Sequence, residues 1–281
     1  IKPDSFEALS NLSATLNSLQ RYGEAIDACI ESLEINPDYE FAYRNMANFL
    51  MGFEFNSHRP DIAKIILKIL NKKDIINPGW LSSAVISLLK LDPLIINNLN
   101  KLSSGKLQDM FEEILVSLSN IPLLLRLMES SNINDLELED FFKKLRSVIL
   151  INISKIENNS EILNFQVSLS SHCYMNEYLY DETSEEIEAL KKLEDLVKSK
   201  ISNGYQPSSN ELAALASYKA LNKYSWIHSI EIPIELEFLK TRQILEPIEE
   251  ENLKTEISIL ENVLNSTSIK VRQQYEENPY P

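Results

Sequence analysis

The chain has 281 residues, a formal net charge of −15 and only five glycines. At the usual frequency of about 7%, a chain of this length would hold about 20 glycines. Helices tolerate glycine poorly because it loses the most backbone entropy on folding, so the composition predicts an all-α protein. The acidic balance argues against nonspecific nucleic-acid binding and against docking on an anionic membrane, because both depend on Lys and Arg.

Loops that bind phosphate groups are missing from the sequence, since it contains no G-x-G and no G-K-[ST] string. We therefore expect no cofactor in this chain. Its two cysteines, Cys29 and Cys173, are too few for a disulfide framework and favour a reducing cytoplasm. No apolar run reaches the length of a membrane span, and no signal peptide is visible.

The first 70 residues contain a repeat. The string Ile-Lys-Pro-Asp at 1–4 recurs as Ile-Asn-Pro-Asp at 35–38, an offset of 34 residues, which is the period of tetratricopeptide (TPR) repeats. Between the two copies lie two amphipathic stripes joined by Tyr-Gly-Glu-Ala at 22–25. This pattern resembles TPR repeats and implies antiparallel helical hairpins in a right-handed superhelix. Residues 1–70 hold one clear repeat and one degenerate repeat.

Further helices are predicted in chain order after this repeat region. Apolar periodicity predicts a helix over 61–70, in the degenerate second repeat, and helices over 80–89, 106–118, 121–128 and 138–151, which we group as additional hairpins over 71–150. A long apolar and aromatic helix is expected over 161–180. Thr183 with Glu186, and Ser208 with Glu211, form capping-box patterns that start the next two helices. Helices over about 234–245 and 249–264 complete a helical domain at 151–281.

Two asparagines are the sharpest local signal. Asn11 and Asn45 lie 34 residues apart, at equivalent places in successive first helices. An asparagine amide can both donate to and accept from a peptide backbone, and first helices line the concave face of such arrays. The pair looks like the asparagine ladder of the TPR superhelix in O-GlcNAc transferases, with Phe41, Arg44 and Asn48 on the same surface. The alternative is that both are ordinary solvated polar residues.

The remaining candidate groups, which are histidines, an acidic run and an aromatic cluster, are better explained by roles in the fold than by a functional site. His58, His172 and His228 are dispersed, and we expect them in the core or on the surface rather than around a metal. The acidic run 181–186 is typical of a solvated first helical turn. The six aromatic residues Tyr174, Tyr178, Tyr180, Tyr218, Tyr224 and Trp226 favour a packed core over a ligand pocket. No set of residues predicts a nucleophile, a general base or a metal site, so we expect no enzymatic activity in this chain.

Three strings in the second half are more specific: HCYMNEY at 172–178, TRQILEP at 241–247 and VRQQYEENPYP at 271–281. Together, and in this order, they resemble the region of bacterial TPR-containing, S-adenosylmethionine-dependent methyltransferases that precedes the methyltransferase domain. The chain stops before any strand, glycine loop and helix that would hold the cofactor. The resemblance implies contacts with such a downstream domain from Asn176, Glu177, Tyr178, Tyr275, Glu276, Glu277, Asn278 and Tyr280.

The sequence thus predicts a non-catalytic interaction module that binds a protein or peptide partner for a downstream methyltransferase domain. The alternative is a structural scaffold in which the repeat face pairs with a second copy of the chain. Exposure of the predicted contact residues would favour the first hypothesis, and a stable dimer would favour the second.

Overall fold

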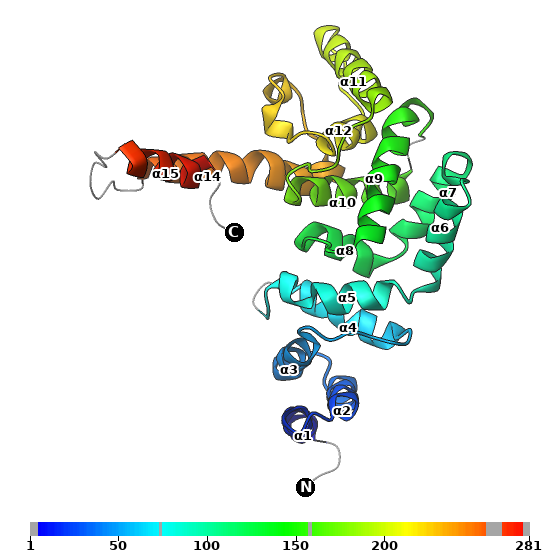
Figure 1. The fold of residues 1–281 in the computed structure, drawn as a ribbon, viewed down its shortest axis with the longest axis vertical. Coiled ribbons are helices and arrows are strands. Elements are labelled where there is room, and N and C mark those ends of the chain that lie inside the picture. Colours follow the sequence, from blue (N-terminus) through cyan, green and yellow to red (C-terminus); the bar gives the residue numbers. More distant parts are fainter. Residues whose placement is uncertain (1–4, 73–74, 157–158, 257–265, 278–281) are drawn as a thin grey trace. The chain divides into compact units, whose positions relative to one another are not determined.

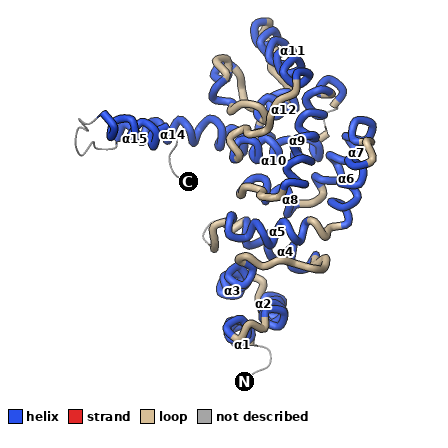
Figure 2. The backbone as a smooth tube through the Cα atoms, in the orientation of Figure 1, coloured by secondary structure: helices blue, strands red, loops and turns tan. Residues whose placement is uncertain are grey.

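A computed structural model describes residues 5–72, 75–156, 159–256 and 266–277. The described part of the chain consists of helices joined by loops and contains no strand, as Figure 2 shows. Contacts divide the chain into two units, residues 1–244 and 245–281. In the first unit α10 contacts α7 and α8, so helix packing continues across residue 150. The predicted domain boundaries at residues 70 and 150 stay a prediction.

The first unit begins with four helices, α1 (Phe6–Ser18), α2 (Tyr22–Ile35), α3 (Glu40–Leu50) and α4 (Pro60–Leu70). In Figure 1 they follow one another from the N-terminus in blue to cyan. Small residues at the helix contacts, Ala25, Cys29 and Ala42, are fully buried. They let α2 pack against both α1 and α3, while α1 also contacts α3 and α3 contacts α4.

The middle of the first unit holds α5 (Ser82–Leu89), α6 (Pro93–Ser103), α7 (Leu107–Ser119), α8 (Pro122–Ser130) and α9 (Leu136–Ile151). A short 3-10 helix, Pro78–Leu81, precedes α5. Proline opens α4, α6 and α8 at the first turn, where its missing N–H costs no helical hydrogen bond. The predicted helices over 80–89, 106–118, 121–128 and 138–151 are therefore present, with ends shifted by a few residues.

The rest of the first unit is built around α10 (Ser160–Met175), which contacts α7, α8, α12 and α13. The later helices α12 (Ser209–Ala216) and α13 (Glu237–Lys240) pack against it, and α11 (Ser184–Ser202) packs against α9 and α12. Both predicted capping boxes are confirmed: Thr183 and Ser208 accept from the backbone N–H of Glu186 and Glu211, whose carboxylates accept from the N–H groups of the two caps. The predicted helix over 161–180 is too long, since α10 ends at Met175.

The second unit contains α14 (Glu246–Glu256) and α15 (Ser266–Glu277). A π-helical turn, Thr241–Leu245, comes directly before α14. The expected helix over 234–245 is thus split into short 3-10, α and π turns, and that over 249–264 extends partly outside the described residues. Of the described helices, none is long and apolar enough by itself to cross a membrane, and one pair broken by a 73° bend meets the criteria by length and composition only.

Candidate functional site

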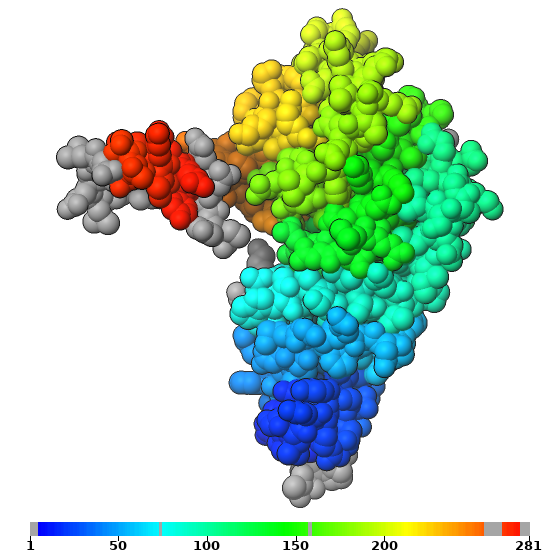
Figure 3. All heavy atoms as spheres, in the orientation of Figure 1, coloured from blue at the N-terminus to red at the C-terminus, as the bar shows by residue number. Residues whose placement is uncertain are grey.

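The predicted peptide-binding residues lie on α1 and α3. Asn11 and Asn48 are exposed, and the Phe41 side chain is 66% exposed despite its apolar ring. Arg44 is half-buried and forms an ion pair with Glu40, one turn earlier on α3, at 2.6 Å. In the space-filling view the residues of α1 to α3, in blue, lie next to those of α4 and α5, in cyan (Figure 3).

Asn45 differs from the other asparagines of this surface because its amide is used within the protein. Its Nδ2 donates to the Ser10 carbonyl at 3.1 Å and contacts Ser10 Oγ at 3.0 Å. These bonds fix α3 against α1. We define the α1–α3 face as Asn11, Phe41 and Asn48, the exposed members of the predicted set, with Asn45 as the residue that joins the two helices beneath them.

The Asn176-Glu177-Tyr178 string forms the turn that ends α10. Glu177 and Tyr178 have φ angles of +56° and +58°, in the left-handed region that non-glycine residues rarely adopt. The Tyr178 N–H donates to the Cys173 carbonyl at 2.8 Å, as at many helix C-termini. Tyr178 is half-buried and donates to the Ala216 carbonyl, whereas Glu177 is exposed. Of these residues, Glu177 therefore has the side chain most open to another molecule.

The remaining predicted contact residues belong to the C-terminal string. Tyr275 lies on α15 with 49% of its surface exposed. Glu276 and Glu277 end that helix. Asn278 and Tyr280 lie outside the described residues, and a contact of this string with a further domain stays a prediction.

Sequence reasoning missed a buried ion pair between Arg146 of α9 and Glu186 of α11. Both residues are 1% exposed, and Arg146 Nη2 lies 3.4 Å from Glu186 Oε1. The Tyr218 hydroxyl donates to the same carboxylate oxygen at 2.7 Å, and the Tyr218 ring lies 4.1 Å below the guanidinium. The prediction that the run 181–186 is a solvated turn is therefore wrong for Glu186, although residues 181–185 are exposed.

The Glu186 carboxylate is ionised in spite of its burial. Burial opposes its charge, but hydrogen bonds from Thr183 and Tyr218 and the charge of Arg146 outweigh that cost and lower its pKa. A carboxylate with a lowered pKa stabilises the fold above its ordinary pKa of about 4.3 and loses this contribution as the pH falls through the lower value.

We therefore expect Glu186→Gln to destabilise the protein most at neutral pH. The free-energy difference from the wild type should stay constant down to about pH 5 and shrink below about pH 4.3, where the glutamate of the unfolded wild type becomes protonated while Glu186 of the folded protein is still ionised. Urea unfolding at several pH values measures it. A difference that grows on acidification would contradict the assignment of Glu186 as an anion.

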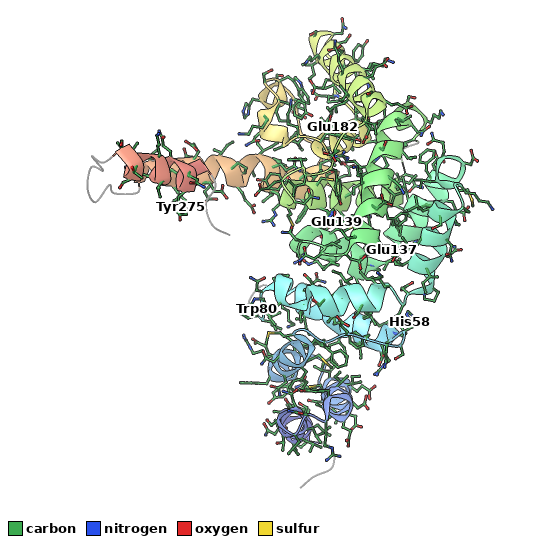
Figure 4. All side chains as sticks on the ribbon, in the orientation of Figure 1. His58, Trp80, Glu137, Glu139, Glu182 and Tyr275 are labelled. Atoms are coloured by element: carbon green, nitrogen blue, oxygen red, sulfur yellow. The ribbon has the colours of Figure 1, made fainter. Side chains whose placement is uncertain are left out.

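A second polar cluster joins α9, α10 and the segment after α10. The Tyr180 hydroxyl donates to Glu139 Oε2, and His172 Nε2 lies 2.8 Å from the same hydroxyl (Glu139 is labelled in Figure 4). Because the Tyr180 hydroxyl donates to Glu139, its oxygen can accept a hydrogen bond from His172 Nε2. His172 is fully buried, as expected for a core histidine, and the cluster serves to hold three segments together.

Burial also governs the chemistry of the two cysteines, both of which are free thiols. It raises the pKa of Cys29 to about 11 and that of Cys173 to about 12. The thiolate is the reactive form, so we expect neither cysteine of the folded protein to react rapidly with a thiol-specific disulfide reagent at pH 8, and both to react in denaturant. Rapid native labelling of one thiol would contradict its described burial.

Within the described residues, no group of three or more His, Cys, Asp or Glu side chains is arranged to hold a metal ion. Comparisons of the chain with protein-family models, with curated proteins and with solved structures found no significant match.

Proposed function

We propose that this protein is a helical-repeat interaction module of the TPR type, which binds an extended peptide segment of a partner protein on the α1–α3 face. The observation that carries the proposal is the exposure of Phe41, Asn11 and Asn48 on two adjacent first helices. The 34-residue offset of Asn11 and Asn45 supports the repeat assignment, as does the packing of α1 with α2 and α3.

Helical geometry supports placing these three residues on one surface. On α3, Phe41 precedes Asn45 by four positions and Asn48 follows Asn45 by three. Phe41, Asn45 and Asn48 therefore share one side of α3. Asn11 is adjacent to Ser10, to which Asn45 is bonded. The ring of Phe41 would supply an apolar anchor, and the two exposed amides would bind peptide N–H and C=O groups.

A peptide-library selection against the chain tests this proposal. We expect selected peptides to lose at least about tenfold in affinity for Phe41→Ala, since truncation of a central aromatic anchor costs on the order of 2 kcal/mol. Leu136→Ala is the matched control, because Leu136 is 91% exposed on α9, away from the α1–α3 face. Equal loss in both variants, or self-association in place of peptide binding, would contradict the proposal.

The setting that we propose for this module is a methyltransferase. It rests on the resemblance of the strings at 172–178, 241–247 and 271–281 to the region that precedes such a domain. The module would then present a peptide substrate to S-adenosylmethionine-dependent chemistry carried by another domain. The test of this setting is calorimetric titration of S-adenosylmethionine into this chain and into a longer product of the same gene. We expect binding by the longer protein alone. Absence of binding by both proteins would refute the methyltransferase assignment.

A further inference from the structure

The sequence contains one asparagine that is directly followed by a glycine. This pair, Asn203 and Gly204, lies at the C-terminal end of α11, the helix labelled at the top of Figure 1, and no other glycine of the chain follows an asparagine. Residues 202–206 are all exposed. Gly204 has a φ angle of +79°, and beyond its neighbours in the chain no described atom lies within 4 Å of the place that a Cβ would take. Side chains therefore do not hinder the approach of the Gly204 backbone nitrogen to the Asn203 amide.

The folded state holds these two reacting groups apart. Asn203 Nδ2 donates to the Ser199 carbonyl at 2.8 Å, which turns the side chain back along α11. The Gly204 N–H donates to the Ile201 carbonyl at 3.0 Å, as at other helix ends that carry a left-handed glycine. The amide and the backbone nitrogen can therefore react only when the last turn of α11 opens. Exposed helix ends open at a small free-energy cost, so the chain visits this open state repeatedly.

We propose that Asn203 is a site of spontaneous deamidation and that opening of the last turn of α11 controls its rate. The backbone nitrogen of Gly204 attacks the side-chain carbonyl carbon of Asn203 and forms a cyclic imide. The C–N bond of the side-chain amide breaks, and its nitrogen leaves as ammonia with the proton that Gly204 gives up. Water then opens the ring at one of its two carbonyl groups and leaves aspartate or isoaspartate at position 203. The chain and water are the only reactants, and the reaction does not depend on the α1–α3 face.

Deamidation is expected to weaken the end of α11. The new carboxylate lies at a helix C-terminus, where the helix dipole disfavours a negative charge, and it can no longer donate to the Ser199 carbonyl. It also lies three positions after Lys200, which pairs with Glu211 at 2.6 Å, and it competes for that lysine. Because Glu211 belongs to the capping box of α12, the modification acts on the link between α11 and α12.

Peptide mapping by mass spectrometry, after incubation of the folded protein at mildly alkaline pH, tests the site. We expect deamidation first at Asn203 and much less at Asn56, which is also exposed but is followed by Ser57. A synthetic peptide of residues 199–208 should react at least about tenfold faster than the folded protein, because it has no helix end to open. Faster reaction at Asn56 than at Asn203 would overturn the site, and equal rates in peptide and protein would overturn its control by α11.

Two substitutions test the consequence of the modification. Asn203→Asp introduces the carboxylate of one product and should lower the midpoint of thermal unfolding by about 1–3 °C, because a negative charge at a helix C-terminus is unfavourable. Asn56→Asp makes the same chemical change in the exposed segment between α3 and α4, and it should move the midpoint by less than about 1 °C, as most surface substitutions do. Equal shifts in the two variants would refute the effect of deamidation on α11.

Discussion

Replacing Arg146 with methionine is expected to lower the free energy of unfolding by about 3–5 kcal/mol, because it leaves the buried Glu186 carboxylate without its counter-charge. Arg146 Nη2 also contacts the Tyr180 carbonyl at 3.3 Å, and its guanidinium stacks on the Tyr218 ring. The substitution therefore affects the junction of α9 and α11 at several contacts. Urea unfolding of the two proteins measures the difference.

The matched control is Lys144→Met, two residues away on the same helix. Lys144 pairs with Asp140 at 2.7 Å, but both side chains are about half exposed, and such pairs contribute roughly 0–1 kcal/mol. The double variant Arg146→Met with Glu186→Leu should recover much of the loss, since it removes both buried charges together. A loss for Arg146→Met no larger than that for Lys144→Met would contradict the described burial of the pair.

Replacing Phe165 with alanine should cost about 3–5 kcal/mol of unfolding free energy, the range for truncation of a buried aromatic side chain. Phe165 is fully buried on α10, the helix that contacts α7, α8, α12 and α13, so a cavity there weakens several helix contacts at once. Thermal or denaturant unfolding measures the effect.

Phe41→Ala makes the same chemical change at a side chain that is 66% exposed. Its expected cost is within about 0.5 kcal/mol, as for most surface substitutions. A comparable loss of stability in both variants would contradict either the core position of Phe165 or the exposure of Phe41. The small expected cost also makes Phe41→Ala suitable for the peptide-binding test, because its fold should be intact.

Local sequence patterns were sufficient to predict structural features that depend only on residues a few positions apart in the chain. The capping boxes at Thr183 and Ser208 were predicted because the partners lie three residues apart. The all-helical composition and the approximate extents of α4, α5, α7, α8 and α9 were also predicted, since apolar periodicity and proline positions are local signals, whereas α6 was not predicted.

Features that depend on distant residues could not be predicted. Glu186 looks like part of a solvated acidic turn until Arg146, 40 positions earlier, is placed beside it. The same holds for Asn45, whose amide binds Ser10 across 35 positions of the chain. The end of α10 at Met175 carried only a weak signal, Asn176, because the two left-handed residues that follow are Glu177 and Tyr178 rather than glycine.

The most direct test of the α1–α3 face is the coupling between Asn11 and the backbone of a selected peptide. Affinities are measured for wild-type protein and Asn11→Ala, each with the peptide and with analogues N-methylated at one backbone position at a time. The account predicts that one N-methyl group weakens wild-type binding about tenfold but has little further effect on Asn11→Ala, because the same hydrogen bond is already lost. Fully additive losses at every position would contradict recognition of the peptide backbone by this asparagine.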